Sequence, residues 1–211
     1  NITSLIAEKS INVFLNFYST GTNKLSDTNN LRTTIVNDLN YTSNDFISNS
    51  GFKNSFDIYF KNLNAVGKND TIYTSNAQVD GKSTLKFDSS FPLLKSNNTI
   101  NQTLTPKISL RINPGNNMDD YSGSSANINA NNVFDINRLG LSNDFEEGRS
   151  LTFGLDYKFD KYENNQSKDT KDKYFELKLA KVVRDQNENN IPISSTINQK
   201  SSDIFGSINN Q

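Results

Sequence analysis

Apolar and polar side chains alternate most regularly between Ser150 and Asp160. The large apolar residues all take odd positions there: Leu151, Phe153, Leu155, Tyr157 and Phe159. The positions between them hold polar residues or glycine: Thr152, Gly154, Asp156 and Lys158. Successive side chains of a strand point to opposite faces, so this order predicts a β-strand with one apolar and one polar face.

The same alternation recurs along most of the chain. It is found in seven further stretches: Leu5–Phe17, Leu31–Tyr41, Phe52–Phe60, Tyr73–Leu93, Ile100–Ile112, Phe175–Leu179 and Ile204–Ile208. None of these stretches follows the 3.6-residue period of an amphipathic helix. The pattern therefore predicts an all-β protein, with about eight to nine long antiparallel strands.

The length of the stretches favours a membrane β-barrel over a soluble sheet. Strands of soluble proteins usually hold about 5–6 residues. A 15-residue strand tilted near 45° rises roughly 35 Å along a barrel axis, which covers an apolar band of ~25 Å. We therefore expect residues 1–211 to be a segment of a transmembrane β-barrel that continues beyond this sequence. In such a barrel the apolar face meets lipid and the polar face lines a wet lumen.

The predicted connections alternate in length, as they do in outer-membrane barrels. Tight turns are expected at 48–51 and 95–98, and longer loops at 20–30, 64–71 and 184–200. The longest connection is an external loop at 114–146, and the segment 161–172 departs from the alternation because it is not short.

Composition narrows the possible chemistry. The chain has no cysteine, histidine or tryptophan, so thiol catalysis, histidine-dependent triads and Cys/His metal sites are excluded. A formal net charge of −1 argues against nucleic-acid binding. No run of 18 apolar residues is present, so no transmembrane helix is expected. We expect no enzyme activity, no cofactor and no metal site.

Carboxylates in or next to the predicted long loop include Asp119, Asp120, Asp144, Glu146 and Glu147. They suit Mg²⁺ or Ca²⁺ bridging phosphates, although a solvated loop is the favoured interpretation. Arg138, in the same loop, is expected either to pair with one of these carboxylates through both guanidinium arms or to be exposed.

Three ordered motifs lie in the second half of the chain, NNVFDINRLGLSNDFEEGRSLTFGLDY at 131–157, LTPKISLRINPG at 104–115 and SSDIFGSI at 201–208. Together they resemble the C-terminal barrel domain of the outer-membrane lipopolysaccharide-assembly protein, also called the organic-solvent-tolerance protein family. The residues that carry the resemblance include Asn132, Phe134, Asn137, Arg138, Asp144, Glu147, Gly148, Gly154, Ser202, Asp203 and Gly206. The sequence departs from the family at Leu139-Gly140-Leu141 and lacks the cysteines that many members use to join the barrel to a periplasmic domain.

The resemblance implies a translocon in the bacterial outer membrane. Members of the family take lipopolysaccharide from a periplasmic bridge and insert it into the outer leaflet, with a plug lipoprotein inside the barrel. The periplasmic domain of the family is not expected in residues 1–211. Residues expected to face the lumen are Lys107, Arg111, Thr152, Asp156, Lys158, Glu176 and Lys178.

Two other classes fit the strand pattern, a different outer-membrane barrel such as a porin or receptor, and a secreted β-rich adhesin. The face assignment predicts that Leu155→Arg harms barrel assembly, because arginine on a lipid-facing side is costly. Thr152→Arg, on the other face, is expected to be milder.

Overall fold

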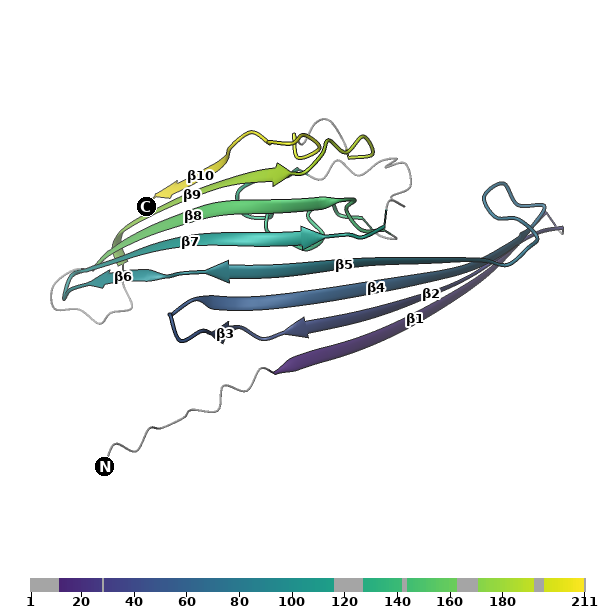
Figure 1. The fold of residues 1–211 in the computed structure, drawn as a ribbon, viewed down its shortest axis with the longest axis horizontal. Coiled ribbons are helices and arrows are strands. Elements are labelled where there is room, and N and C mark those ends of the chain that lie inside the picture. The colour runs from purple at the N-terminus through teal and green to yellow at the C-terminus, as the bar shows by residue number, and fades with distance from the viewer. Residues whose placement is uncertain are drawn as a thin grey trace, which may run out of the picture.

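The computed structural model of the chain is a single large antiparallel β-sheet (Figure 1). It describes residues 12–27, 29–115, 127–141, 144–162, 171–191 and 196–210. All regular elements in these ranges are strands, ten in number. Within the same ranges, no helix is long and apolar enough to cross a membrane.

Eight strands follow one another in the sheet in the order β1-β2-β4-β5-β7-β8-β9-β10, and each pairs antiparallel with its neighbour. They are β1 (Val13–Ser26), β2 (Asn30–Ser43), β4 (Lys53–Lys68), β5 (Gln78–Ser90), β7 (Ile100–Ile112), β8 (Arg149–Tyr162), β9 (Lys171–Arg184) and β10 (Phe205–Asn210). The all-β antiparallel fold is thus confirmed. The described sheet is open, with β1 and β10 at its edges, so closure into a barrel stays a prediction.

Two short strands, β3 (Phe46–Ile47) and β6 (Leu93–Ser96), continue β2 and β5 after a break. β3 pairs with β4, and β6 pairs with β7, so each occupies the same place in the sheet as the strand before it. Between β5 and β6 lies Pro92, and the β7 residues without a ladder partner on this side are Thr105 and Pro106. Proline has no N–H to donate to the ladder, which explains why the pairing is interrupted here.

The register sorts side chains into an apolar face and a polar face. One row of the apolar face joins Phe56, Phe87, Leu110, Leu151 and Val183 across five strands. The next row on the opposite face contains Lys86, Arg111, Ser150 and Arg184. Many apolar side chains remain exposed, including Phe17 at 64% and Phe153 at 46%. The apolar face is therefore uncovered in this structure.

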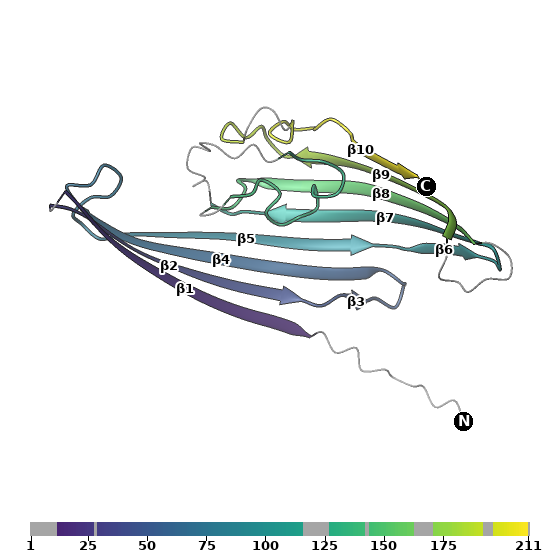
Figure 2. The ribbon, with the colours of Figure 1, turned by 180° about the vertical axis from the view of Figure 1, so that it is seen from behind.

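The buried apolar core lies on the polar side of the sheet, beneath the connections that follow β7 and β9. It contains Ile128, Val133, Leu139, Ala180, Val182, Ile191 and Ile197. Ala180 and Val182 come from β9, where the inner positions change from charged to apolar. The loops supply the other residues of this core. In Figure 2 the coloured part of the chain between β7 and β8 crosses in front of the sheet. The loops thus form a second layer over one end of the sheet.

Several predicted boundaries were wrong. The expected loop at 20–30 is the end of a long hairpin, because β1 runs to Ser26 and β2 begins at Asn30. Both faces are polar there, so alternation gave no signal, but cross-strand hydrogen bonds such as Thr22–Thr34 (2.5 Å) hold the pair together. The expected strand Tyr73–Leu93 begins only at Gln78.

The expected loop at 64–71 is also displaced, because β4 continues to Lys68 and β5 begins at Gln78. Three expected connections are confirmed: β7 and β8 are joined by the longest connection, and short turns join β3 to β4 and β6 to β7. The first part of the predicted strand Leu5–Phe17 lies outside the described residues, as does most of the segment between β8 and β9.

Candidate functional site: a loop held in the polar face

The long β7–β8 connection is anchored to the polar face by an aromatic ring. Gly154 lies beneath Phe134, and a Cβ added at Gly154 would be 2.5 Å from the ring atom Cζ. The ammonium of Lys107 lies 4.3 Å from the centre of the same ring, within the range of a cation–π contact. Glycine at position 154 therefore lets the loop approach the sheet closely.

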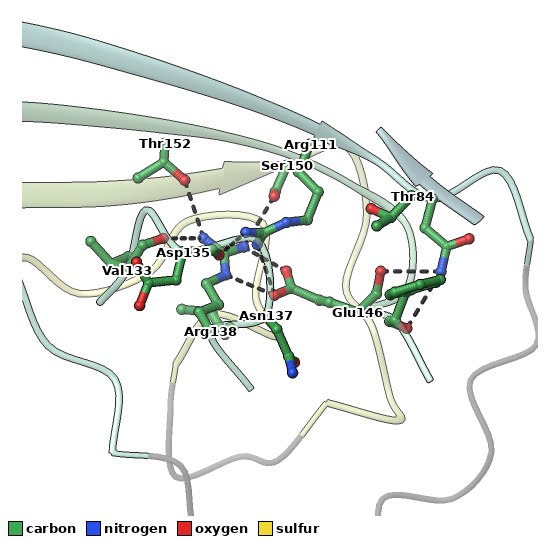
Figure 3. Close-up of polar contacts among 12 residues, drawn as sticks. Thr84, Arg111, Val133, Asp135, Asn137, Arg138, Glu146, Ser150 and Thr152 are labelled. Carbon is green, nitrogen blue, oxygen red and sulfur yellow. Dashed lines mark hydrogen bonds and ion pairs between the residues drawn. The ribbon is translucent and has the colours of Figure 1, made fainter. Parts of the chain in front are cut away.

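Arg138 fixes the loop from within. Its Nε donates to Glu146 Oε2 at 2.7 Å, and its Nη2 donates to Glu146 Oε1 at 2.5 Å (Figure 3). Nη1 donates to Thr152 Oγ1 at 3.1 Å, and Nη2 also donates to Ser150 Oγ at 3.0 Å. The predicted two-armed pair between Arg138 and a loop carboxylate is confirmed, and it is buried against β8.

Two further arginines converge on Glu146 from the sheet. Arg111 of β7 donates from Nη1 to Glu146 Oε2 at 3.0 Å, and Arg184 of β9 donates from Nη2 to Glu146 Oε1. Other donors of these two arginines reach loop carbonyls, since Arg111 Nη2 donates to Asp135 O and Arg184 Nε donates to Ile197 O. We call Arg111, Arg138, Arg184 and Glu146 the arginine cluster. The arginine cluster ties the β7–β8 and β9–β10 connections to three neighbouring strands, β7, β8 and β9.

Electrostatics make Glu146 the centre of the arginine cluster. Burial by itself would raise the pKa of this carboxyl, but the three guanidinium groups outweigh burial and hold the pKa below its usual range. Glu146 is 4% exposed, and the three arginines are each at most 5% exposed. Three buried cations thus share one buried anion.

The seven residues predicted to face a lumen share the polar face. Lys107 pairs with Asp156 at 2.7 Å, and Lys178 lies 3.4 Å from Glu176. Two of the seven, Arg111 and Thr152, are buried beneath the loop rather than open to solvent. Thr152 is 2% exposed and accepts a hydrogen bond from Arg138, so Thr152→Arg is now expected to be disruptive rather than mild.

The interpretation of the loop carboxylates as solvated is wrong for those that the structure describes. Asp144 accepts from Lys82 Nζ at 2.8 Å, and Glu147, 8% exposed, accepts from Asn190 Nδ2 at 2.9 Å. No group of three carboxylates suited to a metal ion is present in the described ranges. Asp119 and Asp120 lie outside them.

The remaining residues of the family-like motifs shape the loops. Asn137 closes a turn by accepting from Leu141 N at 2.8 Å and donating to Leu141 O at 2.8 Å. Asn132 accepts from Asn129 N in a similar turn. Gly148 has φ +79°, a conformation that favours glycine, where the chain enters β8.

The last motif lies beside the same loops. Ser202 Oγ accepts from Val182 N at 2.9 Å and donates to Asp203 O at 2.7 Å. Gly206 pairs with Leu179 on the apolar face. The resemblance had identified Ser202 and Gly206, but the sequence analysis missed Arg184 and Ser150 as members of the site. The signal that could have found them is their even-numbered position on amphipathic strands, which places them on the polar face.

Gly154→Ala should destabilise the protein by about 1–3 kcal/mol, because the new methyl group collides with Phe134 in a packed site. The change is measured as a shift in the urea unfolding midpoint. Gly206→Ala is the matched control, since its nearest neighbour would be Leu179 at 3.7 Å. In a Phe134→Ala background the cost of Gly154→Ala should largely vanish, and an undiminished cost would refute the proposed contact.

Comparison with known proteins gives no relative for this chain: no family model matches it, and no curated protein or solved structure does so either. The resemblance to the lipopolysaccharide-assembly family stays a prediction from the motifs.

Proposed function

We propose that this chain forms part of the wall of an outer-membrane β-barrel, with its apolar face toward lipid and its polar face toward a wet lumen. The observation that carries the proposal is the slant of the exposed apolar band across the strands. In a barrel the strands tilt by about 35–45° while the membrane band stays level, so the band must cross the register rows obliquely.

The slant can be followed along one row. On β8 the apolar band ends at Leu151, since the next residue on that face is Arg149. The same row reaches Phe56 on β4. On that face of β4 the apolar residues continue four positions further toward the loop side, to Phe60, and the next residue on the face is Asn62. On β9 the band ends in the row of Leu151, at Val183.

These positions give the size of the slant. Four residues correspond to about 13 Å along a strand, and the four strand spacings from β4 to β9 correspond to about 19 Å. The band therefore runs at roughly 35° to the perpendicular of the strands, close to the tilt of membrane barrels.

The composition of the band supports the same proposal. Aromatic rings gather at its turn-side border, where Phe52 packs on Phe91 with 4.9 Å between centroids and Tyr157 packs near Phe175 at 6.2 Å. Girdles of aromatic residues border the lipid-facing band of outer-membrane barrels. At the loop-side border the apolar face becomes polar, and Asn37 and Asn62 hydrogen-bond to each other at 3.2 Å. A soluble sheet would bury so wide an apolar face against another layer.

Within this class, we propose a part of the translocon that inserts lipopolysaccharide into the outer leaflet. The three ordered motifs support this narrower proposal, and their residues cluster where the loops meet the sheet. Partners would then be lipopolysaccharide, a plug lipoprotein in the lumen and the periplasmic bridge. A porin, a receptor or a secreted adhesin is the alternative.

The absence of native cysteine allows a direct test of the two faces. Leu39→Cys on the apolar face and Asn40→Cys on the polar face are each labelled with a fluorophore in the protein reconstituted in bilayers. A nitroxide-bearing lipid should quench the Leu39→Cys label strongly and the Asn40→Cys label weakly, while a water-soluble quencher should give the opposite order. Equal lipid quenching at both positions would refute the membrane proposal.

The narrower proposal needs a separate readout. Depletion of the full-length protein from its host should reduce the lipopolysaccharide that is accessible at the cell surface. Unchanged surface lipopolysaccharide, with lipid quenching as predicted, would leave the barrel proposal intact and reject the translocon.

A further inference from the structure

A second polar site lies away from the arginine cluster, between the long loop and strands β2 and β4. It is a cavity of about 170 Å³ with lining residues that include Asp38, Asn40, Tyr59, Lys61 and Asn137. The first four belong to the polar face of the sheet, and the loop adds Asn137 together with the apolar side chains of Ile136, Leu141 and Phe145. Two elements far apart in sequence therefore build the walls of one cavity.

The register extends this site toward β1. Tyr18 pairs with Asp38, and Asp38 pairs with Lys61, so these three side chains form one row of the polar face. The adjacent row holds Asn40 and its partner Tyr59. Tyr18 is 58% exposed, so its aromatic ring is uncovered on this face of the sheet.

Both lysines at or beside the site are already paired with carboxylates. Lys61 Nζ lies 2.5 Å from Asp38 Oδ1, and Lys82 Nζ, on the next strand, lies 2.8 Å from Asp144 Oδ2 and 3.6 Å from Asp80 Oδ2. Paired charges of this kind offer many donors and acceptors but little net field. The site is thus unsuited to a phosphate or a free cation, and suited to a neutral ligand rich in hydroxyl groups.

We propose that Tyr18, Asp38, Asn40, Tyr59 and Lys61 form a binding site for a neutral oligosaccharide. A carboxylate accepts hydrogen bonds from hydroxyl groups, and an amide both accepts and donates them. The electron-rich faces of the tyrosine rings suit the C–H groups of sugar rings. The inference goes beyond the proposed function and concerns the polar face alone, so it does not depend on whether the opposite face meets lipid.

The spacing of the two tyrosines sets the size of the ligand. Tyr18 and Tyr59 are separated by two strand spacings and by two residues along the strand, which is about 12 Å. A separation of this size fits linked sugar rings better than a single ring. Affinity should therefore rise from monosaccharide to trisaccharide.

The test is a titration of the whole chain in a zwitterionic detergent, which has no sugar headgroup to compete, followed by saturation-transfer NMR. The probes are neutral trisaccharides of glucose, galactose, mannose or N-acetylglucosamine, the matching monosaccharides, and inorganic phosphate. At least one trisaccharide should bind saturably and at least fivefold more tightly than its monosaccharide, while phosphate should not bind.

Two variants locate the site. Tyr59→Ala and Asn40→Leu should each weaken trisaccharide binding at least fivefold. None of the side-chain hydrogen bonds described above for the fold involves Asn40, so Asn40→Leu should fold. Thr105→Ala, on the polar face of β7, is the matched control and should bind as the parent does. The proposal is overturned if no trisaccharide binds, if phosphate binds in its place, or if Asn40→Leu folds and binds as tightly as the parent. Lipid quenching at Leu39→Cys is a separate readout, so failure here leaves the barrel proposal standing.

Discussion

Glu146→Gln is expected to destabilise the protein by about 3–5 kcal/mol, the usual result of removing one partner from a buried set of charges. The substitution keeps the size of the side chain but leaves Arg111, Arg138 and Arg184 buried without their shared anion. Urea unfolding of the variant should begin at lower concentration. Trypsin should also cleave after Arg138, which is 3% exposed in the folded chain.

The adjacent carboxylate provides the control. Glu147 is also buried, but its described partner is the amide of Asn190, and glutamine at this position retains an oxygen that can accept the bond. Glu147→Gln should change the unfolding free energy by less than about 1 kcal/mol. If the two variants behaved alike, Glu146 would not be the shared anion of the three arginines.

Leu155→Arg is expected to block insertion of the protein into bilayers, because arginine on a lipid-facing side of a barrel costs about 2–4 kcal/mol near the midplane. Leu155 lies on β8 within the apolar band, opposite Pro106 and Leu179. The measurement is the fraction of protein that acquires the compact, heat-sensitive form on detergent gels.

A control for Leu155→Arg must lie on the polar face and outside the buried loop contacts. Thr105 meets both conditions and pairs with Asp156, which offers an opposite charge to a new arginine. Thr105→Arg should assemble at close to the parental level. Equal assembly of both variants would show that the apolar face does not meet lipid.

The alternation of apolar and polar residues was sufficient to predict the two faces of the sheet. At Ser150–Asp160 the side chains alternate with a period of two, so the local sequence alone fixes which residues share the apolar face and which share the polar face. The same logic failed between Thr20 and Asn30, where threonine and asparagine occupy both faces and pair across the strands. Hydrogen-bonded polar ladders have no hydrophobic period, so sequence patterns do not reveal them.

The sequence by itself also placed Arg138 and several carboxylates in one long connection, and it left open whether Arg138 pairs with one of them or is exposed. Only the tertiary structure decided that the carboxylate is Glu146 and that Arg111 and Arg184 join it, since these arginines come from strands on either side of β8. Strand order and register bring such residues together, and both depend on long-range backbone pairing. The tertiary structure also decided that Ile128, Val133 and Leu139 of the loop are buried, because these apolar residues find a surface only once Ala180 and Val182 are in place.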